Sequence, residues 1–203
     1  MPHDRAAHGD ALAQRHGLIL QVDTPQTLYE QPGDLFVAGF IGSPAMNLVE
    51  ATIADGEVRL GQFTVKLDPA RRPEGVESGP VILGIRPETF EDASFASAEL
   101  PTIDVEVVVL EELGSDAHVF FRVHATRIAA ETLGEDEDST ADLVTDRGSL
   151  LNARVDARTM ARVGYPVRLA VDPSRFHFFD AVSGASLLGA GSGDREPAAS
   201  LAS

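Results

Sequence analysis

Apolar and polar residues alternate along most of the chain after residue 45, a two-residue period typical of β-strands with one buried face. In the longest example, Ile103, Val105 and Val107 alternate with the acids Asp104 and Glu106. Many short strands separated by turn residues predict an antiparallel barrel or sandwich. The predicted strands are 46–53, 57–60, 63–67, 81–85, 103–113, 117–123, 150–155, 167–171 and 176–179.

Cap and turn residues mark where other elements begin and end. Thr24 is placed to cap a short helix whose first residue is Pro25, because proline lacks only an N–H that would be unpaired there. Asp34 is placed to cap a second helix over 35–41, which Gly-Ser-Pro at 42–44 ends. Asp-Gly at 55–56 predicts a tight hairpin turn.

The pattern divides the chain into four parts. Residues 1–16 are polar without a clear period, so we expect a divergent, poorly ordered or weakly helical N-terminus. We expect residues 17–45 to form a helical linker after a short strand-like run at 18–22, and residues 46–188 to form the β-barrel. The Gly/Ser/Ala-rich stretch 189–203 is predicted to be a disordered tail.

The charge excludes several classes of partner. The chain of 203 residues is 43% hydrophobic and carries 32 acidic against 16 basic residues, a net charge of −16. Such a surface repels phosphate backbones and anionic lipid, so we expect no nucleic-acid binding and no direct membrane insertion. The sequence has no cysteine, which excludes disulfides and thiolate metal sites. We therefore expect a soluble, cytosolic protein.

Half of the net charge lies in one region. Residues 111–146 contain ten acids and two arginines, a net charge of −8. The densest part, 131–146, falls between predicted strands and is interpreted as an acidic surface loop. Glu135 to Asp138 offer clustered oxygens for calcium, but the glycine and glutamate at the spacing of an EF-hand loop are missing. A solvated loop without metal is the prediction.

Catalytic signals are absent from the sequence. The apolar strand ending in Glu111 and Glu112 imitates the magnesium-positioning strand of P-loop ATPases, but the Gly-Lys-Ser/Thr phosphate cradle is missing and Lys66 is the single lysine. His118 and His124 share a strand face about 20 Å apart, too far for one metal. No Gly-x-Ser-x-Gly elbow is present. We expect no catalytic residue, no bound cofactor and no metal.

Three glycine- and proline-punctuated stretches carry a specific signal: 17–32 (Gly-Leu-Ile-Leu-Gln-Val-Asp-Thr-Pro-Gln-Thr-Leu-Tyr-Glu-Gln-Pro), 36–47 (Phe-Val-Ala-Gly-Phe-Ile-Gly-Ser-Pro-Ala-Met-Asn) and 83–88 (Leu-Gly-Ile-Arg-Pro-Glu). They resemble the carboxy-terminal half of the ATP-binding subunits of maltose-importer-type ABC transporters. The resemblance implies a mainly β chain with an OB-like or MOP-like antiparallel barrel, the TOBE regulatory domain, behind short N-terminal helices.

The resemblance also implies a role and partners. The barrel would pair as a homodimer, act with the ATPase and membrane subunits of a sugar importer, and lie in the cytoplasm at the inner face of the membrane. ATP and magnesium would belong to an ATPase domain that this sequence lacks, so the chain would hydrolyse no ATP by itself. Asp23 in place of glycine, the acidic stretch 131–146 and the dissimilar residues 1–16 depart from the family pattern.

The motifs supply a set of candidate regulatory or interface residues. The segment 85–88 has two interpretations: a strand end with an ordinary ion pair of Arg86, or a contact between the barrel and the ATPase half. The candidates are Phe40, Ile41, Gly42, Pro44, Asn47, Arg86, Pro87 and Glu88.

Two alternative functions stay open. The barrel could sense a small ligand, either an oxyanion or a sugar, although the charge of −16 disfavours an anion. The chain could also be a truncated remnant without function.

Overall fold

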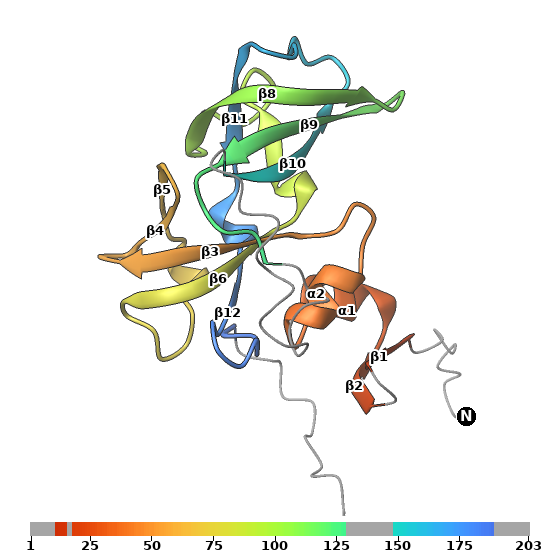
Figure 1. The fold of residues 1–203 in the computed structure, drawn as a ribbon, viewed down its shortest axis with the longest axis vertical. Helices are drawn as coiled ribbons and strands as arrows, with labels where there is room; N and C mark the ends of the chain where they lie inside the picture. Colours follow the sequence, from red (N-terminus) through yellow and green to blue (C-terminus); the bar gives the residue numbers. More distant parts are fainter. Residues whose placement is uncertain (1–10, 16–17, 129–147, 189–203) are drawn as a thin grey trace, which may run out of the picture.

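The computed structural model describes residues 11–15, 18–128 and 148–188. Its strands form a small N-terminal hairpin and two five-stranded antiparallel sheets, with two short helices beside them (Figure 1). The mainly β, antiparallel architecture predicted from the sequence is confirmed. The expected acidic loop 131–146 and the tail 189–203 lie outside the described residues.

The hairpin pairs β1 (Ala11–Arg15) with β2 (Leu18–Asp23). The expectation of a poorly ordered or weakly helical N-terminus is therefore wrong for residues 11–15. They pair along their whole length with the strand-like run that follows, and the Ala13 side chain is buried with Leu28 and Val37 of the helices. Pairing and packing against a later part of the chain hold this strand, so its own residues show no regular alternation of apolar and polar positions.

The helices begin where the sequence predicts. In α1 (Pro25–Glu30) the Thr24 side chain accepts a hydrogen bond from the backbone N–H of Thr27, and Pro25 is the first helical residue. In α2 (Leu35–Phe40) the Asp34 carboxylate accepts from the N–H of Val37 at 2.8 Å. Both caps satisfy N–H groups that have no partner inside the helix. No helix in the described ranges is long and apolar enough to cross a membrane.

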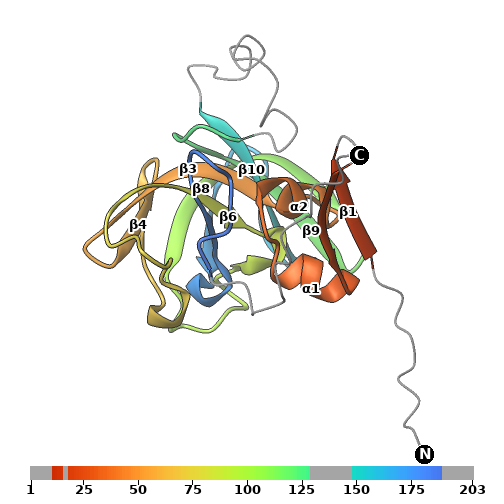
Figure 2. The same cartoon turned by 90° about the horizontal axis from the view of Figure 1, so that it is seen from below.

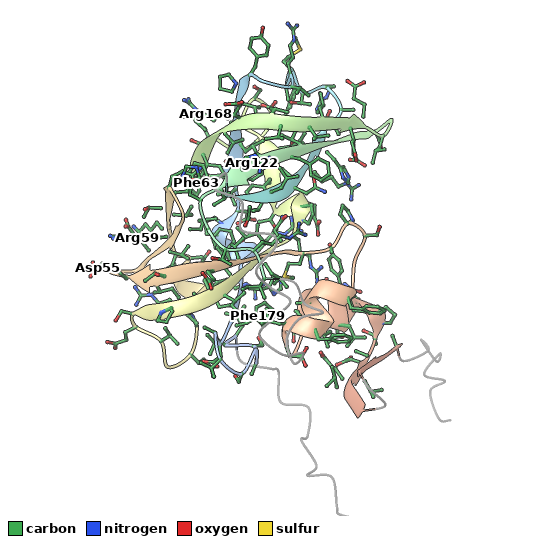
Figure 3. The ribbon with its side chains drawn as sticks, in the orientation of Figure 1. Asp55, Arg59, Phe63, Arg122, Arg168 and Phe179 are labelled. Atoms are coloured by element: carbon green, nitrogen blue, oxygen red, sulfur yellow. The ribbon has the colours of Figure 1, made fainter. Side chains whose placement is uncertain are left out.

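The first sheet has the strand order β12-β6-β3-β4-β5. Its β3–β4 turn is the predicted Asp55-Gly56 hairpin, with φ of 55° and 76°, and Figure 3 shows Asp55 at its outer tip. The strands are β3 (Asn47–Ala54), β4 (Glu57–Leu60), β5 (Phe63–Lys66), β6 (Gly79–Ile85) and β12 (His177–Phe179).

The second sheet has the order β10-β9-β8-β11-β7. Its edge strand β7 is not among the strands that the sequence predicts, because three residues are too few to show a period and the pairing partner β11 is distant in sequence. The strands are β7 (Phe90–Asp92), β8 (Thr102–Glu112), β9 (Asp116–Val123), β10 (Ser149–Asp156) and β11 (Pro166–Val171). Three single-turn 3₁₀ helices complete the fold: η1 (Pro69–Arg71), η2 (Pro87–Thr89) and η3 (Pro173–Arg175).

Both sheets contribute to one hydrophobic core. Leu83 of the first sheet and Phe121 of the second belong to the same buried cluster, and both are fully buried. The Phe121 ring meets Phe90 edge to face, with centroids 5.5 Å apart. The helices and the hairpin lie together at one side of the sheets, as Figures 1 and 2 both show.

We predict that Phe121→Ala destabilises the chain by about 3–5 kcal/mol, because it leaves a cavity in the core that both sheets share. The matched control is Phe40→Ala, since the Phe40 side chain is 71% exposed and loses only its stacking on Phe36, a loss of about 0.5–1.5 kcal/mol. Urea unfolding followed by circular dichroism measures both. Equal losses in the two variants would contradict a common core around Phe121.

Candidate functional site

Arg86 anchors the helical segment to the first sheet. It directly follows β6, and its side chain is buried, with 2% of the residue exposed. The guanidinium donates hydrogen bonds to the carbonyl oxygens of Ile41, at 3.0 Å, and of Tyr29, and its Cζ lies 3.5 Å from the centre of the Tyr29 ring. Carbonyls at helix ends lack partners inside the helix. One side chain therefore holds the ends of α1 and α2 against the barrel.

A second contact extends this arrangement to the C-terminal part of the chain. The Tyr29 hydroxyl donates to the Glu88 carboxylate in η2. Arg175 of η3 lies 3.7 Å from the same carboxylate and donates to the backbone carbonyl of Glu88 at 2.8 Å. We call Tyr29, Arg86, Glu88 and Arg175 the helix–barrel joint.

Burial shifts the pKa values of three groups in and beside the joint. Burial of the Tyr29 hydroxyl, followed by its hydrogen bond to Glu88, raises the pKa of Tyr29 to about 12. Burial lowers the pKa of the Arg86 guanidinium, an effect opposed by Tyr29 and Glu88. Burial, together with the nearby positive charge of Arg86, lowers the pKa of His177 to about 3, so this imidazole on β12 is neutral at pH 7.

Gly42 lets the chain pass close to the joint. Its φ is +123°, which favours glycine, and a Cβ there would lie 3.1 Å from Nη1 of Arg86 and 3.2 Å from Cε2 of Tyr29. The following Ser43–Pro44 peptide bond is cis, and Pro44 is half-buried. The segment 42–44 thus leads from α2 directly past Arg86 into β3.

Asn47 forms a separate polar bridge between the two sheets. Its Nδ2 donates to the carbonyl oxygens of Ile85, at 3.0 Å, and Asn152, at 2.8 Å, while its Oδ1 accepts from the Asn152 N–H at 2.9 Å. The Asn152 amide in turn lies 3.2 Å from Nδ1 of His118. Asn47, Asn152 and His118 are all buried. The network satisfies the Asn47 amide where β10 approaches β3 and β6, while Asn152 Oδ1 has no hydrogen-bond partner among the described residues.

The structure brings together only part of the predicted site. Ile41, Gly42, Arg86 and Glu88 meet at the joint, and Pro87 is buried as the first residue of η2. Pro44 lies in the adjoining turn, Asn47 serves the separate bridge, and the Phe40 ring is exposed and stacked on Phe36.

The interpretation of Arg86 as one half of an ordinary ion pair is wrong. Its two hydrogen bonds in the described part of the chain go to backbone carbonyls. Three contributors were missed by the sequence analysis: Tyr29, Arg175 and Asn152. Tyr29 lies within a quoted motif, but its partner Glu88 is 59 positions away. A contact of residues 85–88 with an ATPase half remains a prediction.

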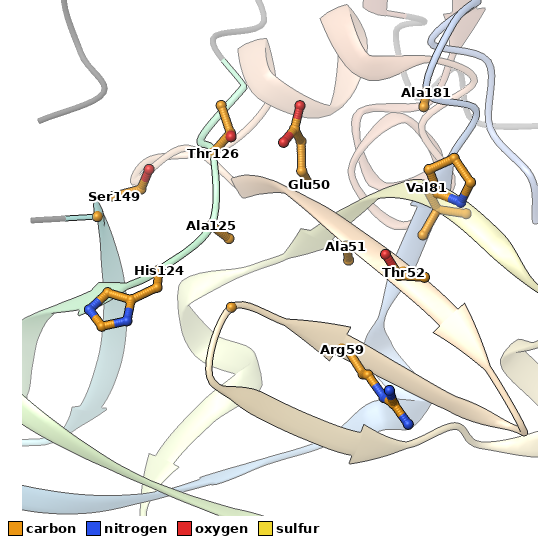
Figure 4. A pocket seen from close by; sticks show the side chains of 13 residues that line it. Glu50, Ala51, Thr52, Arg59, Val81, His124, Ala125, Thr126, Ser149 and Ala181 are labelled. Carbon is orange, nitrogen blue, oxygen red and sulfur yellow. The ribbon is translucent and has the colours of Figure 1, made fainter. Parts of the chain in front are cut away.

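A wide hollow of about 900 Å³ lies on the first sheet, away from the joint. Figure 4 shows Thr52 and Arg59 on the β3–β4 side and His124 across the hollow from them. Among the described residues that line it, Glu50 is the one carboxylate and Arg59 the one guanidinium. These two charges balance, which gives no strong excess of positive charge for an oxyanion.

Comparison with known proteins places this fold in a recognisable class. Residues 42–90 match the family described as the MalK OB fold domain. They include β3 to β6, the joint members Arg86 and Glu88, and the adjoining Gly42. The two-sheet antiparallel architecture and this match define a mainly β protein with an OB fold.

Most of the chain is similar in sequence to ATP-binding proteins of import and uptake systems. The chain is 36% identical over 185 residues to the trehalose import ATP-binding protein SugC of Mycobacterium tuberculosis, covering 84% of this chain and 45% of that protein. It is 36% identical to the diacetylchitobiose uptake system ATP-binding protein MsiK of Streptomyces coelicolor (88% and 46%). It is 35% identical to the trehalose/maltose import ATP-binding protein MalK of Thermococcus litoralis (88% and 44%). The chain spans less than half the length of these relatives.

We predict that Arg86→Met destabilises the chain by about 2–4 kcal/mol, because two partly buried carbonyl oxygens lose their donor and the buried, stacked guanidinium is removed. Arg86→Lys should recover only part of the loss, since an ammonium cannot reproduce the forked geometry. Hydrogen exchange should accelerate selectively in residues 25–41. The control is Arg168→Met, which breaks the exposed ion pair with Asp104 and should cost under about 1 kcal/mol. Uniform acceleration over both sheets would contradict the anchoring role.

We predict that Tyr29→Phe flattens the loss of stability at alkaline pH. An unfolded tyrosine ionises near pH 10, whereas folded Tyr29 ionises near 12. Between these values the unfolded state releases a proton that the folded state keeps, so stability falls as pH rises. Urea unfolding at pH 9, 10 and 11 measures the slope. Tyr165→Phe is the control, since it removes the chain's other tyrosine, and an identical slope in Tyr29→Phe and the parent would refute the shift.

Proposed function

We propose that this chain is the regulatory and dimerisation part of the ATP-binding subunit of an ABC importer for sugars. The observation that carries the proposal is the match of residues 42–90 to the MalK OB fold domain together with the similarity of most of the chain to ATP-binding proteins of sugar import. In this proposal the subunit works with ATPase and membrane components at the cytoplasmic face of the membrane.

The helix–barrel joint gives the proposal a physical basis. A regulatory barrel has to move the segment that precedes it in the chain. A loosely tethered segment would not follow such a movement. Here the helical segment is fixed by a buried guanidinium that contacts both Tyr29 and Ile41. A displacement of the barrel would therefore carry α1 and α2 with it.

Within this proposal the chain hydrolyses no ATP alone and needs no cofactor. The residues of the sequence offer no glycine-rich cradle ending in Gly-Lys-Ser/Thr, and the single lysine, Lys66, lies on β5. ATP and magnesium would be bound by an ATPase domain outside these residues, in keeping with the name ATP-binding protein that the longer relatives carry.

An exposed apolar turn supports dimerisation. Met160, Val163 and Tyr165 are 77%, 56% and 64% exposed, although hydrophobic and aromatic side chains of this kind favour buried positions. The turn is held against β8, since Gly164 donates to the carbonyl of Val107 at 2.8 Å and Tyr165 accepts from its N–H at 3.1 Å. A fixed apolar and aromatic turn is typical of the core of a protein interface.

We predict that the chain dimerises in about 0.15 M salt or above, where the repulsion between two chains of charge −16 is screened. Val163→Glu and Tyr165→Glu should each weaken the dimer at least tenfold, because each places a charge in the proposed contact. Sedimentation equilibrium measures the association.

Val182→Glu is the matched control. Val182 is 93% exposed but follows β12 of the first sheet, whereas the 160–165 turn connects β10 and β11 of the second sheet. A parent chain that stays monomeric at the highest concentration tested would overturn the dimerisation proposal. Equal weakening by Val182→Glu would instead reject the 160–165 turn as the contact.

A further inference from the structure

The long strand β8 loses one of its two neighbours halfway along its length. On one side it pairs with β9 up to the hairpin turn, with a shift of register between Val107 and Val109. On the other side β11 pairs only with residues 102–106, and the turn before β11 adds two hydrogen bonds to Val107, at 2.8 and 3.1 Å. Figure 1 shows the rest of β8 continuing past β11 to the hairpin tip. Among the described residues, no strand pairs with the outer side of 108–112, which we call the β8 edge.

The alternation of an antiparallel strand determines which backbone groups of the β8 edge are unpaired. The N–H of Leu113 donates across the hairpin turn to β9 at 2.8 Å. Inward and outward groups alternate along such a strand, so the backbones of Glu111 and Val109 also face β9. The N–H and C=O groups of Leu110 and Glu112 therefore face outward, and no hydrogen bond joins them to another described residue. A strand edge with unpaired backbone groups is a template for pairing with another chain.

The side chains along the β8 edge are apolar and acidic. Val109 and Leu113 are 40% and 61% exposed, and they lie on the same face of the strand as Glu111, because side chains alternate between faces. Glu111 and Glu112 are both exposed, and neither has an ion-pair partner in the part of the chain that the structure describes. An extended segment paired with this edge would meet two exposed apolar groups and two free carboxylates.

Charge distinguishes between the possible occupants of the β8 edge. Pairing of two copies of this edge would bring the Glu111 and Glu112 carboxylates of both chains together, in chains that each carry a net charge of −16. Like charges on opposing strands destabilise their pairing, whereas opposite charges stabilise it. A segment with Lys or Arg side chains therefore fits this edge better than a second copy of the chain does.

We propose that the β8 edge binds an extended basic segment of another protein as an added strand. The backbone groups of Leu110 and Glu112 bond to the segment, and its cationic side chains face Glu111 and Glu112. In such strand addition the main-chain hydrogen bonds give affinity and the alternate side chains give specificity. The edge adjoins the 160–165 turn at Val107 but is distinct from it. The two proposals fail separately, because dimerisation is measured by sedimentation of the chain alone and strand addition by peptide binding.

The test uses a basic peptide with strand-like alternation as the probe. A blocked Lys-Val-Lys-Val-Lys-Val peptide is titrated into the ¹⁵N-labelled chain at pH 7 in about 0.15 M salt, where exposed charges are largely screened beyond contact range. We expect saturable NMR shifts at 108–113 and slower hydrogen exchange of the Leu110 and Glu112 N–H groups. The N–H groups of Val109 and Glu111, which face β9, are the internal control and should keep their exchange rates. The analogue with Glu in place of Lys is the charge-reversed comparison and should not saturate.

Variants separate the backbone contribution from the charge contribution. Glu112→Pro removes an outward N–H at an edge position, where proline breaks no bond of the existing sheet, and should weaken binding about tenfold or more. Glu112→Ala is its matched control, since it removes the same carboxylate and keeps the N–H, and should weaken binding about fivefold at most. Glu111→Gln should have a similar effect to Glu112→Ala. Glu57→Gln, on β4 of the other sheet, should leave binding unchanged.

Each contrary outcome identifies what is wrong with the proposal. Equal weakening by Glu112→Pro and Glu112→Ala would reject strand addition, and equal weakening by Glu57→Gln and Glu111→Gln would show diffuse attraction to an acidic surface. Equal affinity for the Glu-containing analogue would reject a basic partner. Protection of the Leu110 and Glu112 N–H groups in the chain alone, increasing with its concentration, would make a second copy the occupant. Hydrogen exchange in the parent chain needs no substitution, so the test remains decisive if Glu112→Pro does not fold.

Discussion

A buried guanidinium with backbone carbonyls as its partners is the interaction on which the arrangement of this molecule depends. Arg86 cannot lose its charge near neutral pH, and burial of that charge is costly unless it is well satisfied. The carbonyls of Tyr29 and Ile41 satisfy Nη2 and Nη1, and the face of the Tyr29 ring covers the guanidinium, while Nε has no hydrogen-bond partner among the described residues. If the helical segment moved away, the charge would be left unsatisfied at the end of β6. The barrel therefore requires the segment that precedes it.

The same logic explains why the two sheets keep one relative position. Their shared core of aliphatic and aromatic side chains is not directional. The Asn47 amide adds direction, because its three hydrogen bonds to Ile85 and Asn152 can form only when β10 of the second sheet lies at one position beside β3 and β6 of the first. Apolar contact supplies the cohesion of the barrel, and one satisfied polar bridge selects its geometry.

Local rules predicted the elements whose determinants are close in sequence. Thr24, Asp34 and the Asp55-Gly56 turn act within four residues, and all three are observed as predicted. The failures involve distant partners. Strand β7 exists because β11 pairs with it, and β1 is a strand because its neighbour β2 and the buried side of the helices accept it.

The candidate site shows the same contrast between residues identified from local motifs and partners that are distant in sequence. Motifs singled out Arg86 and Glu88, but their partners Tyr29 and Arg175 lie 57 and 87 positions away. Chain spacing contains no information on which of the acids or aromatic residues will close such a gap. Burial of Arg86 was also not predictable, since arginine is mostly exposed in proteins. A motif therefore indicated where to look, and only the fold showed what the residues do.

Glu88 is the point where these constraints meet. One carboxylate has two oxygens, and in this structure it already accepts the Tyr29 hydroxyl and faces Arg175. It also lines the neighbouring hollow of about 480 Å³, together with Arg175. Any further donor that enters the hollow must share the same oxygens, and the Tyr29 ring on which Arg86 stacks is held by one of them. A barrel joined to its helices through a shared acceptor ties the position of α1 to that of η3, whereas a purely apolar contact would set no such direction.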